Sequence, residues 1–537
     1  MSASRNALPD DPATRDGTAT AEDTAAAETV EPALAPPRRP LLGIVARGGS
    51  WNALGQLLPV VVNIVLTPYV IHDLGVERFG LWALLLSVTM LLASFDGGIA
   101  PSAQRYFSIY AGRDDSDATT RLFTSLFVLL VSVGSVLFLA LLLLGPQLLE
   151  LLDVPAELHD EGAFVARMMS LVVVFGLLRQ LFSAVLTSHG RFATPSLANV
   201  AGYVAYACGA VVTITAGFGL RGLVCGLVAQ NALSTLLLVP GAMRSLSRSG
   251  VALLPRSELW DYLKYASRVQ VVGLIGIINT QADALITAAF LSVRHVGLLS
   301  AGANFGNQLR YVPVNALVPI ATLLGQAYGE KGEVESHEDF RRLQRLWVIG
   351  STGWSVVALV AVYFGVSAWL GEGYQTSAVV ATIVVAGHGV NLWTGVTTLW
   401  LGIIGRPELE VRYAVISVTL NVLLTLALVV PAGVVGVVTA TAVGQALSSL
   451  YLLRIVRRNL DHPVRSFLRD IPVLPALAAA LTGLALELAV RPVTPTGPLG
   501  LVVCGVAAAP AFVVYALLAV GPRTALAMVR SRGRAAA

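Results

Sequence analysis

The sequence predicts an all-α polytopic membrane protein, with about fourteen transmembrane helices forming two six-helix, pseudo-symmetric lobes plus two C-terminal helices. Two observations predict this fold class. Hydrophobic residues make up 55% of the 537 residues and charged residues only 13%, with a mean hydropathy of +0.73. The chain also repeats itself once, at an offset of roughly 215 residues, as expected of the duplicated halves of a transporter.

Apolar segments of the roughly 20 residues needed to cross a bilayer recur along the chain. The expected crossings lie at residues 44–71, 79–107, 121–145, 162–188, 195–217, 220–243, 259–290, 296–325, 345–369, 376–404, 410–431, 434–456, 470–490 and 497–520. The first twelve divide into two sets of six, and the last two stand outside the repeat.

The repeat is visible in short motifs that keep their order. The octamer at 74–81 (LGVERFGL) recurs in outline at 291–298 (LSVRHVGL), and Gly190-Arg191 is matched by Gly405-Arg406. Each half has an even number of crossings, so both halves should enter the membrane in the same sense, related by an axis along the membrane normal.

These patterns predict the organisation of the chain. We expect a disordered cytoplasmic tail at 1–43, an N-terminal six-helix lobe at 44–243, a cytoplasmic linker at 244–258, a C-terminal six-helix lobe at 259–460, and two extra helices with a basic cytoplasmic tail at 461–537. The first forty residues lack the apolar core of a signal peptide and have a composition typical of disorder.

The positive charges predict the orientation. When loops are assigned to alternating sides, most of the 36 Lys and Arg residues fall on the side of the N-terminus. The arginines on the opposite side are Arg78, Arg167, Arg221, Arg294 and Arg491. Positive loops remain in the cytoplasm, so both termini should be cytoplasmic. This bias also accounts for the net charge of +4, which therefore need not indicate a nucleic-acid partner.

Several kinds of chemistry find no support in the sequence. No glycine-rich loop ends in Gly-Lys-Ser/Thr, so we expect no ATPase activity in the chain itself. Cys208, Cys225 and Cys504 all fall inside expected helices and suit neither a disulfide nor a metal site. We therefore expect no metal, no cofactor and no catalytic residues.

Polar side chains at helical spacing mark some of the helices. In the helix at 296–325, amides and a tyrosine recur on one face, at Asn304, Asn307, Gln308, Tyr311 and Asn315. The helix at 44–71 carries Asn52, Gln56 and Asn63. A face of this kind has no reason to meet lipid, so we expect these residues to line a water-filled substrate cavity.

Charged residues remain inside the expected crossings after the loops are assigned. The arginines are Arg105, Arg179 and Arg310. A charge at the centre of a spanning helix costs about 3 kcal/mol on insertion scales, so such residues usually face a cavity or a partner. Asp96 and Asp283 are the deep carboxylates of the lobes and candidates for ion coupling, as is His388, although a single His among glycines equally suits packing. For Asp96, a salt bridge to Arg105 and a cation or proton site are both open, since Gly97, Gly98 and Pro101 can bend the helix between them.

The opening of the chain resembles a known family. Gly49-Ser50-Trp51-Asn52, the octamer at 74–81, and Asp96-Gly97-Gly98-Ile99-Ala100 followed by Arg105 resemble the bacterial oligosaccharide and polysaccharide (O-antigen type) flippases. These belong to the multidrug/oligosaccharidyl-lipid/polysaccharide exporter superfamily. The resemblance covers about residues 44–460.

The resemblance implies an alternating-access transporter of two lobes around a cationic cavity. It would move an undecaprenyl-pyrophosphate-linked oligosaccharide or polysaccharide repeat unit from the cytoplasmic to the outer leaflet of the bacterial inner membrane. Partners would be the lipid-linked glycan, membrane lipids, and a glycan polymerase and glycosyltransferases. Arginines suit pyrophosphate and amides suit hydroxyls.

Three alternatives remain from the residues. A cation-coupled multidrug extruder or a lipid II flippase of the same superfamily would share the fold. A membrane glycosyltransferase or ligase acting on a lipid-linked glycan belongs to another class. Such enzymes commonly use acidic residues in a sizeable external loop, whereas the acidic loop here, at 147–161, is short.

Overall fold

The computed structural model describes residues 41–94, 96, 98–246, 252–460 and 471–521, with the backbone alone at 41–57, 100–101, 272, 318, 322, 407 and 457–460. The chain is helical and the described residues contain no strand. Nearly all of the predicted tail at 1–43 lies outside the described residues.

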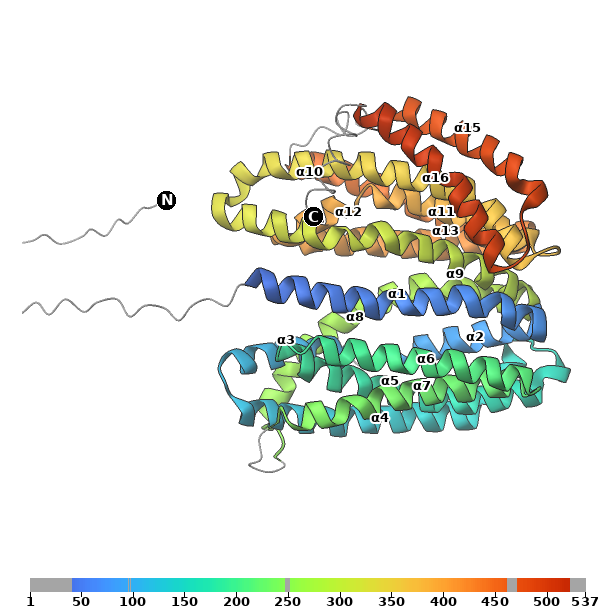
Figure 1. Ribbon diagram of the computed structural model, residues 1–537. Coiled ribbons are helices and arrows are strands. Elements are labelled where there is room, and N and C mark those ends of the chain that lie inside the picture. Colours follow the sequence, from blue (N-terminus) through green and yellow to red (C-terminus); the bar gives the residue numbers. More distant parts are fainter. Residues whose placement is uncertain (1–40, 95, 97, 247–251, 461–470, 522–537) are drawn as a thin grey trace, which may run out of the picture. The chain divides into compact units, whose positions relative to one another are not determined.

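The helices of the first half follow the predicted crossings closely (Figure 1). They are α1 (Leu41–Leu74), α2 (Val76–Ala93), α3 (Ile99–Gly112), α4 (Ser116–Leu151), the short 3₁₀ turn η1 (Ala156–Leu158), α5 (His159–Ser188), α6 (Ala193–Thr215) and α7 (Gly219–Met243). The crossing predicted at 79–107 is broken between α2 and α3, where Gly98 has a φ of 67°. This is the bend that the glycines allowed.

The second half begins with a long helix, and two of its later helices, α10 and α13, each join two helical runs. Its helices are α8 (Arg256–Phe290), α9 (Val293–Asn315), α10 (Leu317–Leu370), α11 (Gln375–Leu392), α12 (Gly395–Ile403) and α13 (Pro407–Leu460), followed by α15 (Val473–Val490), the turn η2 (Arg491–Val493) and α16 (Pro498–Val520). Gly332 in α10 and Gly433 in α13 have φ values of 76° and 56°, which end one helical run and start the next.

Among the described residues, ten helices are long and apolar enough to cross a membrane, or eleven if the pair α11 and α12, bent by 41°, counts as one crossing. The number is lower than predicted because the continuous runs Val293–Leu370 and Glu408–Val456 each contain two of the predicted crossings. In α1, Leu58–Leu74 forms a shorter apolar helix. The predicted fold class is confirmed.

Helices pack within each half and the last two pack on the second. α5 contacts α4, α6 and α7, α6 also contacts α7, and α2 and α3 pack against α5. α9, α10, α11 and α13 form the core of the second half. α15 and α16 lie against α10 (Figure 1). α8 contacts α2 and α3 as well as α9 and α13, so this one helix touches both halves.

The repeated octamers pack against each other where α2 crosses α9. A Cβ atom at Gly80 would overlap the carbonyl oxygen of Val293, and a Cβ atom at Gly297 would overlap that of Val76. Gly80 and Gly297 hold the same place in their octamers, as do Val76 and Val293. The contact is therefore the same from both sides, as a pseudo-two-fold axis between the halves requires.

Candidate functional site

Arg310 belongs to a polar network inside the second half. Its Nη2 donates to Oδ1 of Asn391 on α11 at 3.0 Å, and the Asn391 amide donates to the hydroxyl of Tyr413 on α13. One turn before Arg310, Asn307 pairs with Nε2 of His388 at 2.8 Å, and Nδ1 of His388 pairs with Gln445 at 3.2 Å. Arg310 therefore extends to α11 from the flank of the α9 stripe, the polar face of α9 formed by Asn304, Asn307, Gln308, Tyr311 and Asn315.

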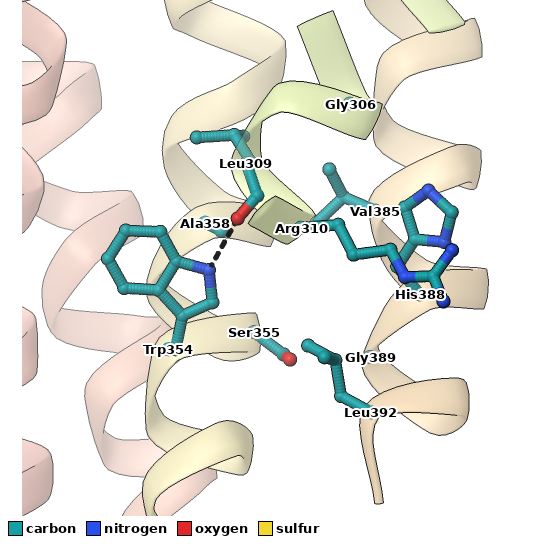
Figure 2. Close-up of a pocket in the computed structure, with 10 residues that line it drawn as sticks. All are labelled: Gly306, Leu309, Arg310, Trp354, Ser355, Ala358, Val385, His388, Gly389 and Leu392. Atoms are coloured by element: carbon teal, nitrogen blue, oxygen red, sulfur yellow. Dashed lines mark hydrogen bonds between the residues drawn. The ribbon is translucent and has the colours of Figure 1, made fainter. Parts of the chain in front are cut away.

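A small pocket adjoins this network (Figure 2). Arg310 and His388 lie on one side of it and Trp354 on the other, where the indole donates to the carbonyl of Leu309 at 3.1 Å. The pocket holds about 10 Å³, room for about one water molecule. Nε of Arg310 and Oγ of Ser355 both line it and have no hydrogen bond within the described part of the chain. A single water suits this space, and a pyrophosphate headgroup does not.

Arg179 lies partly buried on α5, in the first half. The phenol of Tyr203 on α6 is close enough to interact electrostatically with the guanidinium of Arg179. In the part of the chain that the structure describes, no carboxylate forms an ion pair with Arg179. An unpaired guanidinium among spanning helices is a candidate anion site by default.

Arg105 lies on tyrosine rings rather than on a carboxylate. Its guanidinium carbon is 4.7 Å from the ring centre of Tyr265 on α8 and 5.4 Å from that of Tyr106. Asp96 instead accepts a hydrogen bond from the backbone N–H of Gly98 at 2.9 Å, at the break before α3. Of the two roles left open for Asp96, the structure therefore gives no support to a salt bridge with Arg105.

Asp283 on α8 gathers oxygen atoms from α13. Its carboxylate accepts from Thr441 at 2.5 Å and from the Asn421 amide at 3.4 Å. Oδ1 of Asn421 lies 3.0 Å from the Thr441 hydroxyl and 3.3 Å from that of Thr425. Hard cations prefer carboxylate, amide and hydroxyl oxygens of this kind, and the single negative charge favours a monovalent cation or a proton.

The predicted cavity stripe on α9 is largely exposed. Asn304, Asn307, Tyr311 and Asn315 are exposed, and Gln308 is partly buried. On α1, Asn63 is exposed, whereas the side chains of Asn52 and Gln56 lie outside the described residues. Exposed amides in spanning helices need water or a polar ligand, because hydrocarbon cannot satisfy them. The role of the stripe remains a prediction.

Two features add to or change the sequence interpretation. His388 is buried with both ring nitrogens paired to side-chain amides, and its role as a proton carrier or a packing residue stays a prediction. Glu487 on α15 is fully buried beside the thiol of Cys504 on α16, and it was not predicted as a site residue because it lies outside the repeat. Ser417, Asn421 and Thr425 recur every fourth residue on α13, a signal that could have indicated the partners of Asp283.

Comparisons with known proteins point in one direction. Residues 45–324 match the family model described as polysaccharide biosynthesis protein. A putative O-antigen transporter of Shigella flexneri is 21% identical over 342 residues, which cover 62% of this chain and 78% of that protein.

Solved structures show the same fold. An inward-facing multidrug resistance MATE family transporter of the MOP superfamily superposes with a TM-score of 0.65 at 15% identity, covering 74% of this chain and 94% of that one. The lipid II flippase MurJ, in an inward closed conformation, superposes with a TM-score of 0.63 at 14% identity, covering 89% and 98%. At these identities the likeness concerns the fold alone.

Proposed function

Because the chain belongs to the polysaccharide biosynthesis protein family, we propose that it is an alternating-access flippase for undecaprenyl-pyrophosphate-linked oligosaccharide or polysaccharide repeat units. It carries them from the cytoplasmic to the outer leaflet of the bacterial inner membrane, with both termini in the cytoplasm. Glycosyltransferases supply the substrate on one side, and a glycan polymerase uses it on the other. The putative O-antigen transporter among the relatives supports this substrate class.

The observation that carries the proposal is the presence of cations without carboxylate partners in an apolar helical bundle. The headgroup of the substrate has about two negative charges and many hydroxyls, none of which hydrocarbon can satisfy. Within the described residues, neither Arg179 nor Arg310 forms an ion pair, so each guanidinium is available to an anion. The exposed amides of the α9 stripe, Asn304 and Asn315 among them, suit sugar hydroxyls.

Arg310 differs from Arg179 in one respect that the experiment must resolve. It already donates to Asn391, and the pocket beside it holds only about one water molecule. To bind the headgroup, the pocket has to open between α9 and α11. Within the part of the chain that the structure describes, Arg179 has no such bond, so it is the better placed of the two in this conformation.

Coupling to an ion gradient belongs in this proposal to Asp283. The carboxylate, Asn421, Thr425 and Thr441 come from α8 and both runs of α13, and α8 also contacts the first half. Binding of a cation or a proton there stabilises one position of α8, and this is how an ion is able to bias the two access states.

The test is export in cells that lack their own flippase. Arg179→Ala and Arg310→Ala should each abolish surface glycan while the protein still accumulates in the membrane, since losing an arginine–phosphate pair costs about 2 to 5 kcal/mol. Arg179→Lys and Arg310→Lys should rescue only partly, because lysine lacks the bidentate fork.

Asn391→Ala is the matched control for Arg310. It removes the same hydrogen bond but keeps the cation, so export should survive in Asn391→Ala if Arg310 acts on the substrate. Equal loss in both variants, with loss of folded protein, would mean that Arg310 only joins helices. Normal export by well-folded Arg179→Ala and Arg310→Ala variants would refute the cationic-cavity mechanism.

A further inference from the structure

The start of α3 packs closely against α8, and we call this contact the α3–α8 joint. The hydroxyl of Tyr262 on α8 is buried and donates to the carbonyl of Ile99 at 2.5 Å. A Cβ atom at Gly98 would overlap the carbonyl oxygen of Ala266, so the two backbones are in direct contact. Side chains on the adjoining turns of α3 and α8 are therefore held in fixed relative positions.

Arg105 lies on the tyrosine rings beside the α3–α8 joint. Its guanidinium lies over Tyr265 and Tyr106, at 4.7 and 5.4 Å from the ring centres. Tyr106 in turn contacts Tyr262 and Tyr265 edge-on, with ring centres 5.0 and 5.9 Å apart. Aromatic rings attract the face of a guanidinium and leave its N–H edge free. The stack thus orients Arg105 without using its hydrogen bonds.

The stretch of α8 that carries Tyr265 contains both cations and carboxylates. Lys264 and Arg268 are exposed on the same stretch of α8 as Tyr265, one turn apart. The carboxylate of Asp261 bonds Lys264 at 3.2 Å, and Glu258 lies near Tyr110. Among the described residues, no carboxylate forms an ion pair with Arg105 or Arg268. Two arginines therefore remain available to an anion.

The position along α3 suits a lipid headgroup. Arg105 precedes the end of α3 at Gly112 by two helical turns, about 10 Å along the axis. The arginine bias predicts that this end is cytoplasmic. A ligand bound at Arg105 would lie near the depth at which a lipid carrier presents its phosphates.

We propose that the α3–α8 joint is a docking site for the pyrophosphate headgroup of a polyprenyl lipid, formed by the edge of Arg105, with Arg268 and Lys264 beside it. The headgroup binds here before it reaches the deeper Arg179. Pyrophosphate is favoured over a single phosphodiester because two arginines here have no ion pair among the described residues, and an arginine edge pairs two phosphate oxygens at once. This inference rests on the proposed function for the identity of the substrate.

The experiment measures binding of farnesyl pyrophosphate to the purified full chain in phosphatidylcholine nanodiscs. Arg105→Ala should weaken binding at least tenfold. Tyr265→Leu, which removes the ring but keeps the arginine, should weaken it several-fold, and Tyr265→Phe should retain more affinity than Tyr265→Leu because the ring remains. The matched control is Arg113→Ala, which removes an exposed arginine directly after the end of α3 and should leave binding unchanged.

Further arms separate the sources of phosphate. Inorganic pyrophosphate should compete weakly and farnesol should not compete at all. Nanodiscs that contain phosphatidylglycerol should bind farnesyl pyrophosphate nearly as well as those without it. Strong competition by phosphatidylglycerol, or an equal loss in Arg113→Ala and Arg105→Ala, would overturn the proposal in favour of general attraction of anions.

The two proposals fail in different ways. If the wild-type chain does not bind farnesyl pyrophosphate, the proposed substrate is wrong. If the wild-type chain binds it, and Arg105→Ala and Tyr265→Leu bind it equally well, the docking site is wrong while the flippase proposal stands.

Discussion

At the scale of single residues, Asp283 is the carboxylate that α13 surrounds with oxygen atoms. Asp283→Asn keeps the shape of the side chain but removes the only formal charge of the cluster, so it should release transport from its dependence on an ion gradient without unfolding the protein. Transport into vesicles, with and without a Na⁺ or proton gradient, measures this.

A matched pair of threonines provides the control for Asp283. Thr441→Val should weaken the ion dependence because its hydroxyl contacts the carboxylate. Thr439→Val should not, because the one hydrogen bond that its hydroxyl makes among the described residues goes to the carbonyl of Val435 in its own helix. Wild-type ion dependence in Asp283→Asn would place coupling elsewhere.

Glu487 illustrates a second consequence of burial. It is fully buried between α15 and its neighbours, with the thiol of Cys504, a weak donor, beside it. A buried polar group without a strong partner costs about 1 to 3 kcal/mol, so Glu487→Leu should leave the melting temperature in detergent unchanged or raise it. Gly483→Leu, one turn away, should lower it, because a Cβ there already contacts Val360 and Ala511. A lower melting temperature in Glu487→Leu that Glu487→Gln restores would instead show a hydrogen-bonding role.

At the scale of helices, the crossing of α2 and α9 depends on two glycines. Larger side chains at Gly80 or Gly297 must push the helices apart, and overpacking of this kind costs about 1 to 3 kcal/mol. Gly297→Leu should therefore reduce the population of the state in which the octamers touch. Spin labels at the exposed positions of Arg78 and Arg294 should report a longer distance. Gly209→Leu, where a side chain meets open space, should leave that distance unchanged, and so should Gly297→Leu if the contact is incidental.

At the scale of the whole molecule, the exposed stripe on α9 should mark a water-filled path between the lobes. Cysteines replacing Asn304, Tyr311 or Asn315 should react with a hydrophilic maleimide in intact membranes. Cysteines at Leu481 and Val506, which are 68% and 67% exposed on apolar helices, should not react, because lipid covers them. A cysteine at Asn307 would also remove the hydrogen bond to His388, so it is not a clean probe of access. Protection of all three stripe positions would show that this face meets lipid or another helix.

Local information was enough to predict the helices. Each crossing follows from a run of apolar residues, and the break before α3 follows from Gly97 and Gly98. The arginines of the candidate site were also visible, because a charge inside an apolar run stands out without any knowledge of its surroundings.

Only the tertiary structure decided which side chains meet. Asp283 accepts a hydrogen bond from Asn421, which is 138 residues away in the sequence, and Tyr262 donates to Ile99, which is 163 residues away. Arg105 lies on Tyr265 rather than pairing with Asp96, and Arg310 turns toward Asn391 rather than into the stripe. Periodicity shows which face of a helix is polar, but the partner of that face depends on how distant helices pack. Hydrophobicity along the chain therefore determined the elements, and packing between them determined the site.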